Sequence, residues 1–294
     1  MDEKTKKTMK WTETILNEKI KSATLLEGGT SSLLHLLKTD TREVVLREYT
    51  IKEWLEEDPT VVAREAENLK EAENINIPTP KGLGVDAEGS QAGRPSVLMS
   101  KVDGKVELEN LNLEKLAQAL IAIHSLKEPQ ITHKFFSYNT EITNPEATWS
   151  AYPKKWQALF SYLKEQDSPT YKPSFIHRDF HPTNVLWKNG DVSGIVDWPN
   201  ACIGPREFDI AHCRWNLAMM YGQEVADTFL EAYLKHSDLK NYSLYWDLLA
   251  LKNIFEEEPP TVYQGWTHFG LTELTPEIIK QRMDAFLLIA SRNI

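Results

Sequence analysis

Residues 176–197 read IHRDFHPTNVLWKNGDVSGIVD and hold the most informative pattern in the chain. The Asn-Gly pair at 189–190 lies between two apolar runs, which favours a two-residue β-hairpin turn because both central residues need positive φ. Pairing across this turn predicts that Asn184 and Asp197 meet at the open end of the hairpin, just downstream of Asp179. Carboxylate and amide oxygens of this kind suit Mg²⁺ bound together with substrate phosphates. The stretch therefore predicts a loop of polar, reactive residues that leads into a hairpin.

The short sequence motifs in and around this loop indicate which class of protein it belongs to. His177-Arg178-Asp179 followed by Asn184 resembles the catalytic loop of kinases, and Asp197 falls where their second metal-binding aspartate is expected. The flanking words are FHPTN at 180–184, Asp-Trp at 197–198 instead of Asp-Phe-Gly, Gly-Pro at 204–205 and FDIA at 208–211. Together these words resemble the aminoglycoside phosphotransferase and choline kinase-like family, the small-molecule kinases of the protein-kinase-like fold.

This resemblance implies a role for each polar residue of the loop. Asp179 is expected to be the base that accepts the proton of the acceptor hydroxyl, while Asn184 and Asp197 hold Mg²⁺ against the phosphates of ATP or GTP. His177 is expected to be buried and to bond the loop backbone. Asp209 is expected to accept backbone N–H bonds from the same loop, because a bare carboxylate in its apolar setting would be unfavourable. These last two residues are therefore interpreted as structural.

The first third of the chain has the features of a nucleotide-binding lobe. Residues 24–33 read TLLEGGTSSL, a loop whose backbone N–H groups can fold over phosphates; its candidate residues are Gly28, Gly29, Thr30 and Ser31. A second predicted hairpin pairs residues 33–38 with 44–49, and Arg47 stands there where the family's phosphate-binding lysine is expected. Arginine keeps the charge but changes the geometry. We expect its partner to be Glu65, with Glu67 as the competing choice on the same predicted helix.

Composition changes after residue 104, and this change predicts two lobes. The strand at 95–100 ends in polar residues and a glycine, and by resemblance the backbone around Ser100 and Val102 would bind the purine. We expect an N-terminal nucleotide-binding lobe over 1–103 and a mainly helical catalytic and acceptor-binding lobe over 104–294. The fold class is therefore α+β. Helices are expected over about 12–20, 61–69, 108–127, 147–165, 214–236, 242–258 and 275–292.

The acceptor is expected to be a small molecule that carries a hydroxyl group. In the resembling family the corresponding regions line the acceptor site, and acidic and aromatic residues together suit a cationic or sugar-like molecule. The candidates are Trp198, Asn200, Trp215, Glu256, Glu257, Trp266 and His268. Each of them has an ordinary alternative, since core tryptophans and solvated helix ends have the same composition.

Length and charge bound the remaining possibilities. The chain has 294 residues and a net charge of −10, so its average surface would repel a nucleic-acid backbone. Cys202 and Cys213 form no disulfide framework, and no apolar run is long enough for a membrane span. These features predict a cytoplasmic protein with neither nucleic-acid nor membrane partners.

Two other functions compete with phosphoryl transfer. His177, Asp179 and His181 at alternate positions would share one strand face and could form the site of a metal-dependent hydrolase. That reading leaves the glycine loop, Arg47 and Glu65 unexplained. A nucleotide-binding protein without transfer activity is suggested by Arg47 alone, and the presence of Asp179, Asn184 and Asp197 argues against it.

Overall fold

The computed structural model describes residues 3–26, 32–292 and 294. The chain divides into two compact units. The first unit comprises Met1–Gly104 and Ser193–Ala201, and the second comprises Lys105–Val192 and Cys202–Ile294. The first unit is therefore discontinuous in sequence, since a short segment returns to it about ninety residues after the first part ends.

The first unit is built on a five-stranded antiparallel sheet with strand order β1-β2-β3-β5-β4. Strand β3 alternates, so that Val44, Leu46 and Glu48 point to one face and Arg47 and Tyr49 point to the other. The elements are α1 (Glu3–Leu16), β1 (Ser22–Leu26), β2 (Ser32–Lys38), β3 (Glu43–Tyr49), α2 (Lys52–Glu57), α3 (Val61–Ala72), β4 (Gly82–Asp86) and β5 (Ser96–Ser100).

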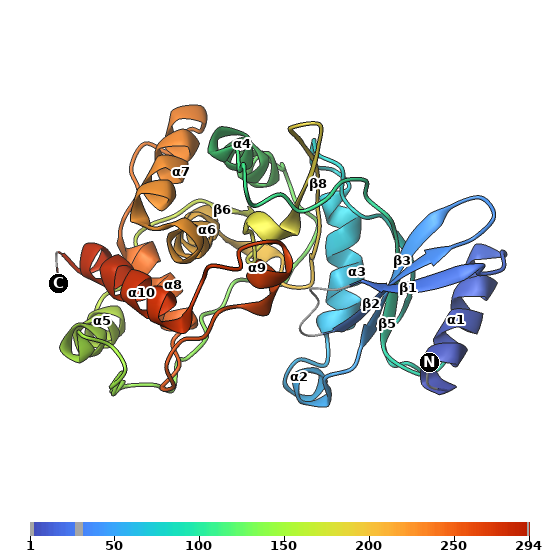
Figure 1. Ribbon diagram of the computed structural model, residues 1–294, viewed down its shortest axis with the longest axis horizontal. Helices are drawn as coiled ribbons and strands as arrows, with labels where there is room; N and C mark the ends of the chain where they lie inside the picture. Colours follow the sequence, from blue (N-terminus) through green and yellow to red (C-terminus); the bar gives the residue numbers. More distant parts are fainter. Residues whose placement is uncertain (1–2, 27–31, 293) are drawn as a thin grey trace. The chain divides into compact units, whose positions relative to one another are not determined.

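Helices cover both faces of this sheet (Figure 1). Trp11 and Leu16 of α1 pack in one core with Val44, Leu46 and Leu98 of the sheet. On the opposite face, α3 packs against β4 and β5. Side chains alternate between the two faces of β3, and each helix packs one of its faces on the sheet. The unit therefore has three layers, and Arg47 lies on the side of the sheet that α3 covers.

Helix α1 begins earlier than the sequence pattern predicts. We expected a helix over about 12–20, whereas α1 runs from Glu3 to Leu16. Its buried face carries Thr5 and Thr8, whose hydroxyls donate hydrogen bonds to the buried carboxylate of Glu48 at 3.3 and 2.8 Å. Because threonines occupy the N-terminal part of this buried face, the first turns of the helix show no apolar periodicity, and this is why the prediction missed them.

The second unit is mainly helical and includes short strands around the loop at 177–181. Strand β6 pairs antiparallel with β9, and β7 and β8 form the predicted hairpin, with φ of 56° at Asn189 and 79° at Gly190. Strand β8 starts in the second unit, and its last residues belong to the first. The elements are α4 (Leu113–His124), α5 (Pro153–Glu165), β6 (Pro173–Ile176), the 3₁₀ turn η1 (Pro182–Asn184), β7 (Val185–Lys188), β8 (Asp191–Ile195), β9 (Cys202–Pro205), α6 (Arg206–Tyr221), α7 (Gln223–His236), α8 (Tyr245–Asn253), α9 (Gln264–His268) and α10 (Pro276–Ala290).

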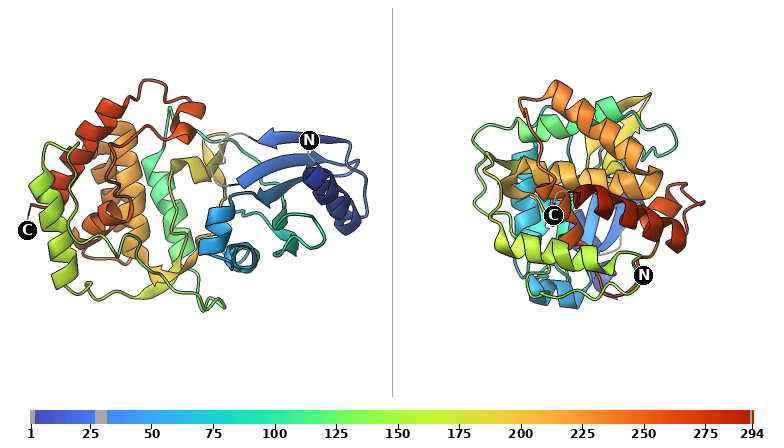
Figure 2. Two further views of the ribbon diagram at one scale, coloured as in Figure 1. Left: turned by 90° about the horizontal axis from the view of Figure 1, so that it is seen from below. Right: turned by 90° about the vertical axis from the view of Figure 1, so that its left-hand side faces the viewer.

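Helix α6 is central to this unit, since α4, α7, α8, α10 and β6 all pack against it (Figure 2). The helix predicted over 214–236 is in fact two helices, because Gly222 adopts a φ of 100° between α6 and α7. Twelve of the sixteen residues of α6 are buried. A helix buried on most sides has weak amphipathic periodicity, so its start at Arg206 was not predicted.

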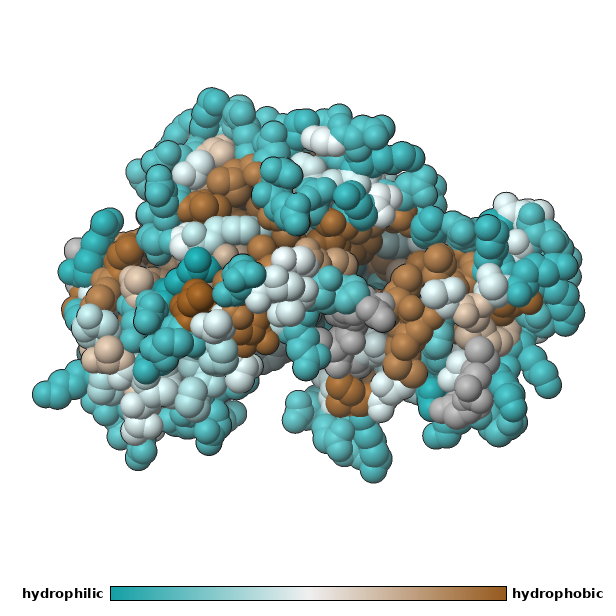
Figure 3. All heavy atoms as spheres, in the orientation of Figure 1, coloured by the Kyte–Doolittle hydropathy of each residue, from teal (hydrophilic) through white to brown (hydrophobic). Residues whose placement is uncertain are grey.

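On the face drawn in Figure 3, hydrophilic side chains prevail, with apolar patches between them. Among the described residues, no helix is both long and apolar enough to cross a membrane.

Candidate active site

The loop that follows β6 is fixed by a single buried carboxylate. Asp209 of α6 is fully buried, and its two oxygens accept the backbone N–H groups of His177 and Arg178, both at 2.7 Å. His124 of α4 contacts Asp209 Oδ2 through Nε2 at 3.1 Å, and its Nδ1 lies 2.8 Å from the hydroxyl of Tyr233. Hydrogen bonds to a carboxylate are the strong kind, so the loop backbone is held rigidly.

Arg178 adopts an unusual backbone conformation within this loop. Its φ is +66°, a left-handed value that costs energy for a bulky residue. The guanidinium offsets this cost: it donates to the carbonyl of Phe136 at 2.7 Å and stacks on the rings of Phe136 and Tyr138, 4.1 and 4.4 Å from their centroids. The turn at Arg178 changes the direction of the chain, and the next residue, Asp179, has a partly exposed side chain.

Asp179 lies among histidines. Its side chain is 31% exposed, and Oδ1 is 3.1 Å from Nε2 of His212 and 3.6 Å from Nε2 of His181. Although burial opposes ionisation, the imidazoles of His181, His212 and His177 hold the pKa of Asp179 well below its usual range. The carboxylate is therefore ionised at neutral pH, the form in which it can accept a proton.

Asn184 closes the loop by bonding back to it. Its Nδ2 donates to the main-chain carbonyl of Asp179 at 2.9 Å and lies 3.4 Å from the Oδ2 of the same residue. His181 supports the turn through Thr183, whose Oγ1 is 2.8 Å from His181 Nδ1. Because the amide nitrogen of Asn184 is engaged with the loop, its Oδ1 is the atom that could bind a metal ion.

The first unit contains a second cluster of charged residues. Arg47 on β3 is 5% exposed, its Nε lies 3.4 Å from Glu65 Oε1 on α3, and a terminal nitrogen lies 2.8 Å from Asp197 Oδ1. The Arg47–Glu65 ion pair anticipated from the sequence is thus present. Burial acts to lower the pKa of Arg47, but the nearby carboxylates of Asp197 and Glu65 raise it above its usual value. Glu67, the competing choice, is exposed.

Tyr49 completes this cluster. It lies two residues after Arg47 on the same face of β3, and its hydroxyl donates to Glu65 Oε2 at 2.7 Å. Burial raises the pKa of Glu65, while Arg47 and the Tyr49 hydroxyl act in the opposite direction. Asp197 is 35% exposed and adopts a φ of +73°, a conformation that aspartate tolerates better than most residues. The cluster thus combines the buried guanidinium of Arg47 with the partly exposed carboxylate of Asp197.

The segment that carries Asp197 is anchored to the first unit by main-chain acceptors. Asn68 of α3 donates to the carbonyls of Trp198 and Ala201 at 2.8 and 2.9 Å, and Arg64 Nε donates to the carbonyl of Pro199 at 2.9 Å. Gly194 passes so close to Val102 that an added Cβ would come within 2.3 Å of its side chain. These contacts fix the position of Asp197 beside Arg47.

The sequence also predicts which residues bind the phosphates and the purine of the nucleotide. Gly28, Gly29, Thr30 and Ser31 lie outside the described residues. The N–H of Ser100 is already bonded to the carbonyl of Lys81 at 2.9 Å, and the side chain of Val102 packs against Gly194.

The candidates for acceptor binding are equally scattered. Trp198 is fully buried in the first unit, where its indole donates to the carbonyl of Ile195 at 3.0 Å, and Asn200 is half-buried in the same segment. Glu257 accepts the N–H of Glu146 at 3.2 Å, and the carbonyl of Glu256 accepts the Trp149 indole at 3.2 Å.

Two of the predicted aromatic residues do lie near Asp179 in the second unit. The ring of Trp215 on α6 is 6.1 Å from His212 and 6.3 Å from Trp266 on α9, measured between centroids. Tyr263 adds to the group, 5.8 Å from Trp266 and 6.5 Å from His181. Tyr263 was not singled out from the sequence, and neither were Tyr49 and His124. Tyr49 had a usable signal in its two-residue spacing from Arg47, whereas His124 had none.

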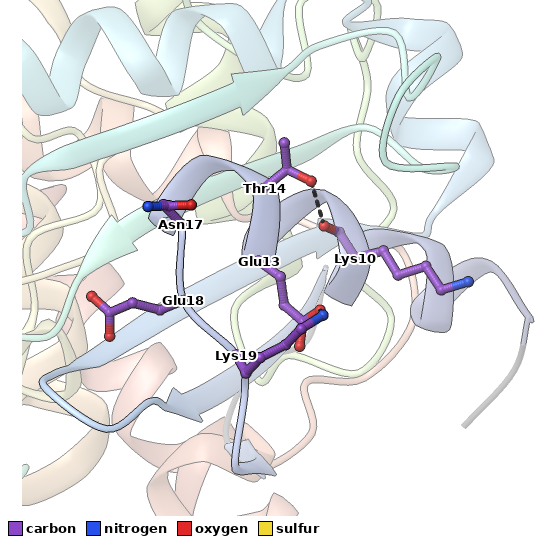
Figure 4. A pocket seen from close by; sticks show the side chains of 6 residues that line it. All are labelled: Lys10, Glu13, Thr14, Asn17, Glu18 and Lys19. Carbon is purple, nitrogen blue, oxygen red and sulfur yellow. Dashed lines mark hydrogen bonds and ion pairs between the residues drawn. The ribbon is translucent and has the colours of Figure 1, made fainter.

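A pocket of about 500 Å³ lies elsewhere on the first unit (Figure 4). It is lined by Lys10, Glu13, Thr14, Asn17, Glu18 and Lys19, from α1 and the turn that follows. Lys19 and Glu13 form an ion pair across it at 2.7 Å. Its lining shares no residue with the two clusters described above.

The described residues also bear on the hydrolase alternative. Within the ranges 3–26 and 32–292, no group of three His, Cys, Asp or Glu side chains is arranged to hold a metal ion. His177 is instead fully buried, with its Nδ1 3.3 Å from the backbone nitrogen of Asp179. Asn184 in the second unit carries an amide oxygen and Asp197 in the first unit a carboxylate oxygen, and both are donors of the hard type that Mg²⁺ prefers.

A buried aspartate that holds the backbone of an Asp-containing loop, together with a strand arginine paired to a helix glutamate, is an arrangement expected of the protein-kinase-like fold. A family model described as the phosphotransferase enzyme family matches residues 22–245. The chain belongs to this family.

Solved structures share the same fold at low sequence identity. The choline kinase LicA from Streptococcus pneumoniae is 16% identical, with a TM-score of 0.64 over 98% of this chain and 99% of that one. A thermostable mutant of aminoglycoside phosphotransferase APH(4)-Ia, solved with ADP and hygromycin B, is 15% identical, with a TM-score of 0.63 over 95% and 97%. An aminoglycoside-3'-phosphotransferase of type VIII is 16% identical, with a TM-score of 0.61 over 85% and 98%. The protein is therefore similar in fold both to aminoglycoside phosphotransferases and to a choline kinase.

Proposed function

We propose that the protein transfers the γ-phosphoryl group of ATP or GTP to a hydroxyl group of a small molecule. The observation that supports this most strongly is the fixed loop around Asp179, which presents an ionised carboxylate on a backbone held by Asp209. Phosphoryl transfer depends mainly on positioning and charge stabilisation, so a carboxylate of low pKa can serve as its base.

In the proposed reaction the acceptor oxygen bonds to the γ-phosphorus as the bond to the bridging oxygen of the β-phosphate breaks. The hydroxyl proton passes to Asp179, and the products are a phosphate monoester and a nucleoside diphosphate. Oδ2 of Asp179 is the better placed oxygen, because its contact with Asn184 is long while Oδ1 already faces two imidazoles.

Arg47 and Glu65 would bind and orient the triphosphate in the first unit. The fork of Arg47 can bond phosphate oxygens bidentately, and its burial beside Glu65 limits its motion. Asn184 through Oδ1 and Asp197 would hold Mg²⁺, which, when bound, neutralises charge on the β- and γ-phosphates. Neighbours of the same fold bind ADP and AMP-PNP, and this supports a nucleotide as the donor.

For the acceptor we propose a cationic or sugar-like alcohol, of the aminoglycoside or amino-alcohol type. Trp215 and Tyr263 are half-buried and lie next to the histidines that surround Asp179, whereas Trp266 is buried and packs against both rings. Aromatic faces bind cations and the apolar faces of sugars. Neighbours that act on choline or bind hygromycin B support both possibilities.

The test is a screen of purified protein with Mg²⁺ and either ATP or GTP. The panel would contain aminoglycosides, macrolides, choline, ethanolamine, other amino alcohols and sugars, with release of nucleoside diphosphate and ³¹P NMR of the product as readouts. Asp179→Asn is the matched control, because it keeps the shape of the side chain without its charge. Calorimetry that detects no binding of either Mg²⁺-nucleotide would refute the proposal, and so would transfer that is equal in wild type and control.

A further inference from the structure

Helix α6 contacts the catalytic loop at two positions one turn apart. Asp209 binds the loop backbone, as described above, and His212 lies three residues later on the same side of the helix. Residues at i and i+3 are neighbours on a helix surface, so both side chains reach the same short loop. One helix thus holds the main chain through Asp209 and meets the side chain of Asp179 through His212.

The contact between His212 and Asp179 is a hydrogen bond. Nε2 of His212 lies 3.1 Å from Oδ1 of Asp179, whereas Nε2 of His181 lies 3.6 Å from the same oxygen, beyond hydrogen-bond distance. The His212 ring is itself held in place. It stacks on Phe208 with a centroid distance of 6.4 Å and an interplanar angle of 30°, and its side chain is 15% exposed.

The proton on His212 can be assigned by chemistry. An ionised carboxylate can only accept hydrogen bonds, so the Nε2 that faces Oδ1 must carry the hydrogen. Oδ1 is therefore occupied by a donor. Among the residues that the structure describes, Oδ2 has one hydrogen-bond contact, a long one to Asn184 Nδ2 at 3.4 Å. The two oxygens of Asp179 are thus in different environments: Oδ1 is bonded to the His212 ring, and Oδ2 is left with a long contact.

We propose that His212 is a positioning residue for phosphoryl transfer, which holds Oδ1 of Asp179 so that Oδ2 faces the acceptor hydroxyl. This inference rests on the proposed function. His212 keeps its own proton throughout: the acceptor proton goes to Oδ2, the acceptor oxygen bonds to phosphorus, and the nucleoside diphosphate leaves. Correct orientation of a reacting group contributes much of the rate in such reactions, and small misplacements are costly.

Three substitutions separate this role from a structural one. In His212→Gln the side-chain amide nitrogen can occupy roughly the position of Nε2 and still donate, whereas His212→Asn is too short and His212→Leu has no donor. We expect His212→Leu and His212→Asn to lower kcat by about 10- to 100-fold with an unchanged KM for the nucleotide, and His212→Gln to stay within about fivefold of wild type. Because a partly exposed pair adds little to folding, thermal midpoints should fall by no more than about 4 °C.

The matched control is His236→Leu. His236 on α7 also bonds a carboxylate, that of Glu114 at 2.6 Å, but it is a surface pair between α7 and α4. We expect this variant to have wild-type kcat. Loss of activity in His236→Leu equal to that in His212→Leu, or a glutamine variant as impaired as the leucine variant, would overturn the assignment.

An NMR measurement tests the contact without any acceptor. In protein labelled with ¹⁵N-histidine, the His212 signals, identified by their loss in His212→Gln, should show the Nε2–H tautomer. Asp179→Ala should then shift the Nε2 resonance. A His212 with its hydrogen on Nδ1, or one insensitive to Asp179→Ala, would refute the proposal. If the wild-type enzyme transfers phosphate to no alcohol, the proposed function fails and the catalytic role with it, while the NMR result still reports the contact.

Discussion

Removing the Arg47–Glu65 pair should damage both folding and nucleotide binding in the first unit. Both side chains are buried, with 6% and 1% of their side-chain surface exposed, and their closest atoms are 3.4 Å apart. Arg47→Ala leaves the carboxylate of Glu65 buried without its cation, whereas Glu65→Ala leaves Arg47 its contact with Asp197. The double variant removes both charges at once.

The size of the effect follows from the geometry. At an effective dielectric constant of about 20, unit charges at this separation attract by about 5 kcal/mol, and the loss of hydration opposes much of that. Deleting one partner of a buried pair costs about 3 to 5 kcal/mol of the free energy of unfolding. Because the two single deletions remove the same interaction, the double variant should lose less than their sum, by about 1 to 3 kcal/mol.

For nucleotide binding, the expected loss is that of charge-assisted hydrogen bonds from Arg47 to phosphate. Such bonds contribute about 1.5 to 3 kcal/mol, which corresponds to about 10- to 150-fold in affinity. Arg47→Lys keeps the charge and loses the fork, so it should fall between wild type and Arg47→Ala. Urea unfolding measures the first quantity, and calorimetry with Mg²⁺ and triphosphate measures the second.

Arg42→Ala is the matched control for this cycle. Arg42 pairs with Glu18, but its side chain is 51% exposed, so the pair adds at most about 1 kcal/mol to folding. We expect it to bind nucleotide normally. Strictly additive losses in the Arg47 and Glu65 variants would show that the two residues are not coupled as an ion pair. Normal nucleotide affinity in Arg47→Ala would show that another residue binds the phosphates.

Three further substitutions test other parts of the proposal. Asp179→Asn should abolish transfer and leave the affinity for Mg²⁺-nucleotide intact, because the base is lost while the phosphate contacts remain; near wild-type turnover would remove Asp179 from the mechanism. Asp197→Ala should weaken binding of Mg²⁺-nucleotide itself, and an unchanged calorimetric titration would count against its role as a metal ligand. Glu48→Gln should lose about 3 kcal/mol of unfolding free energy at pH 7. Although burial opposes ionisation, hydrogen bonds from His35 and Thr8 lower the pKa of Glu48 below 4.5 in the folded protein. The contribution of this carboxylate to stability is therefore complete above about pH 4.5 and is lost as the pH falls through its pKa in the folded protein. In urea unfolding from pH 7 to pH 3, the difference in unfolding free energy between Glu48→Gln and wild type should shrink. A difference that stays constant over this pH range would contradict this reasoning.

The parts of the site that lie close together in sequence were the most predictable. The hairpin at 185–195 followed from an Asn-Gly pair between apolar runs, and both of its turn residues have the positive φ that this turn requires. The choice of Glu65 over Glu67 depended on helical phase and agrees with the burial of Glu65. Local periodicity and turn chemistry carry this kind of information without any knowledge of the tertiary structure.

The parts that depend on packing between distant segments were not predictable. Contact between His212 and Asp179 requires that α6 pass beside the loop with a particular rotation, and thirty-three residues separate the two. The buried threonine face of α1 was missed for a related reason, since its partner Glu48 is forty residues away for Thr8. The acceptor candidates were chosen by composition, and composition does not distinguish the fully buried Trp198 from the half-buried Trp215.

The return of residues Ser193–Ala201 to the first unit has a consequence for synthesis of the protein. A ribosome makes Arg47, Glu65 and Asn68 long before it makes the segment whose carbonyls and carboxylate they bind. At about 5 to 20 residues per second, the gap between Gly104 and Ala201 corresponds to about 5 to 20 s. During this time the nascent first unit lacks Asp197, and of the carboxylate partners of Arg47 within the described residues only Glu65 is present. A fragment that stops at residue 104 should therefore fold less stably than the same unit in the whole chain, and expression of the first unit alone would require residues 193–201 to be joined back to it.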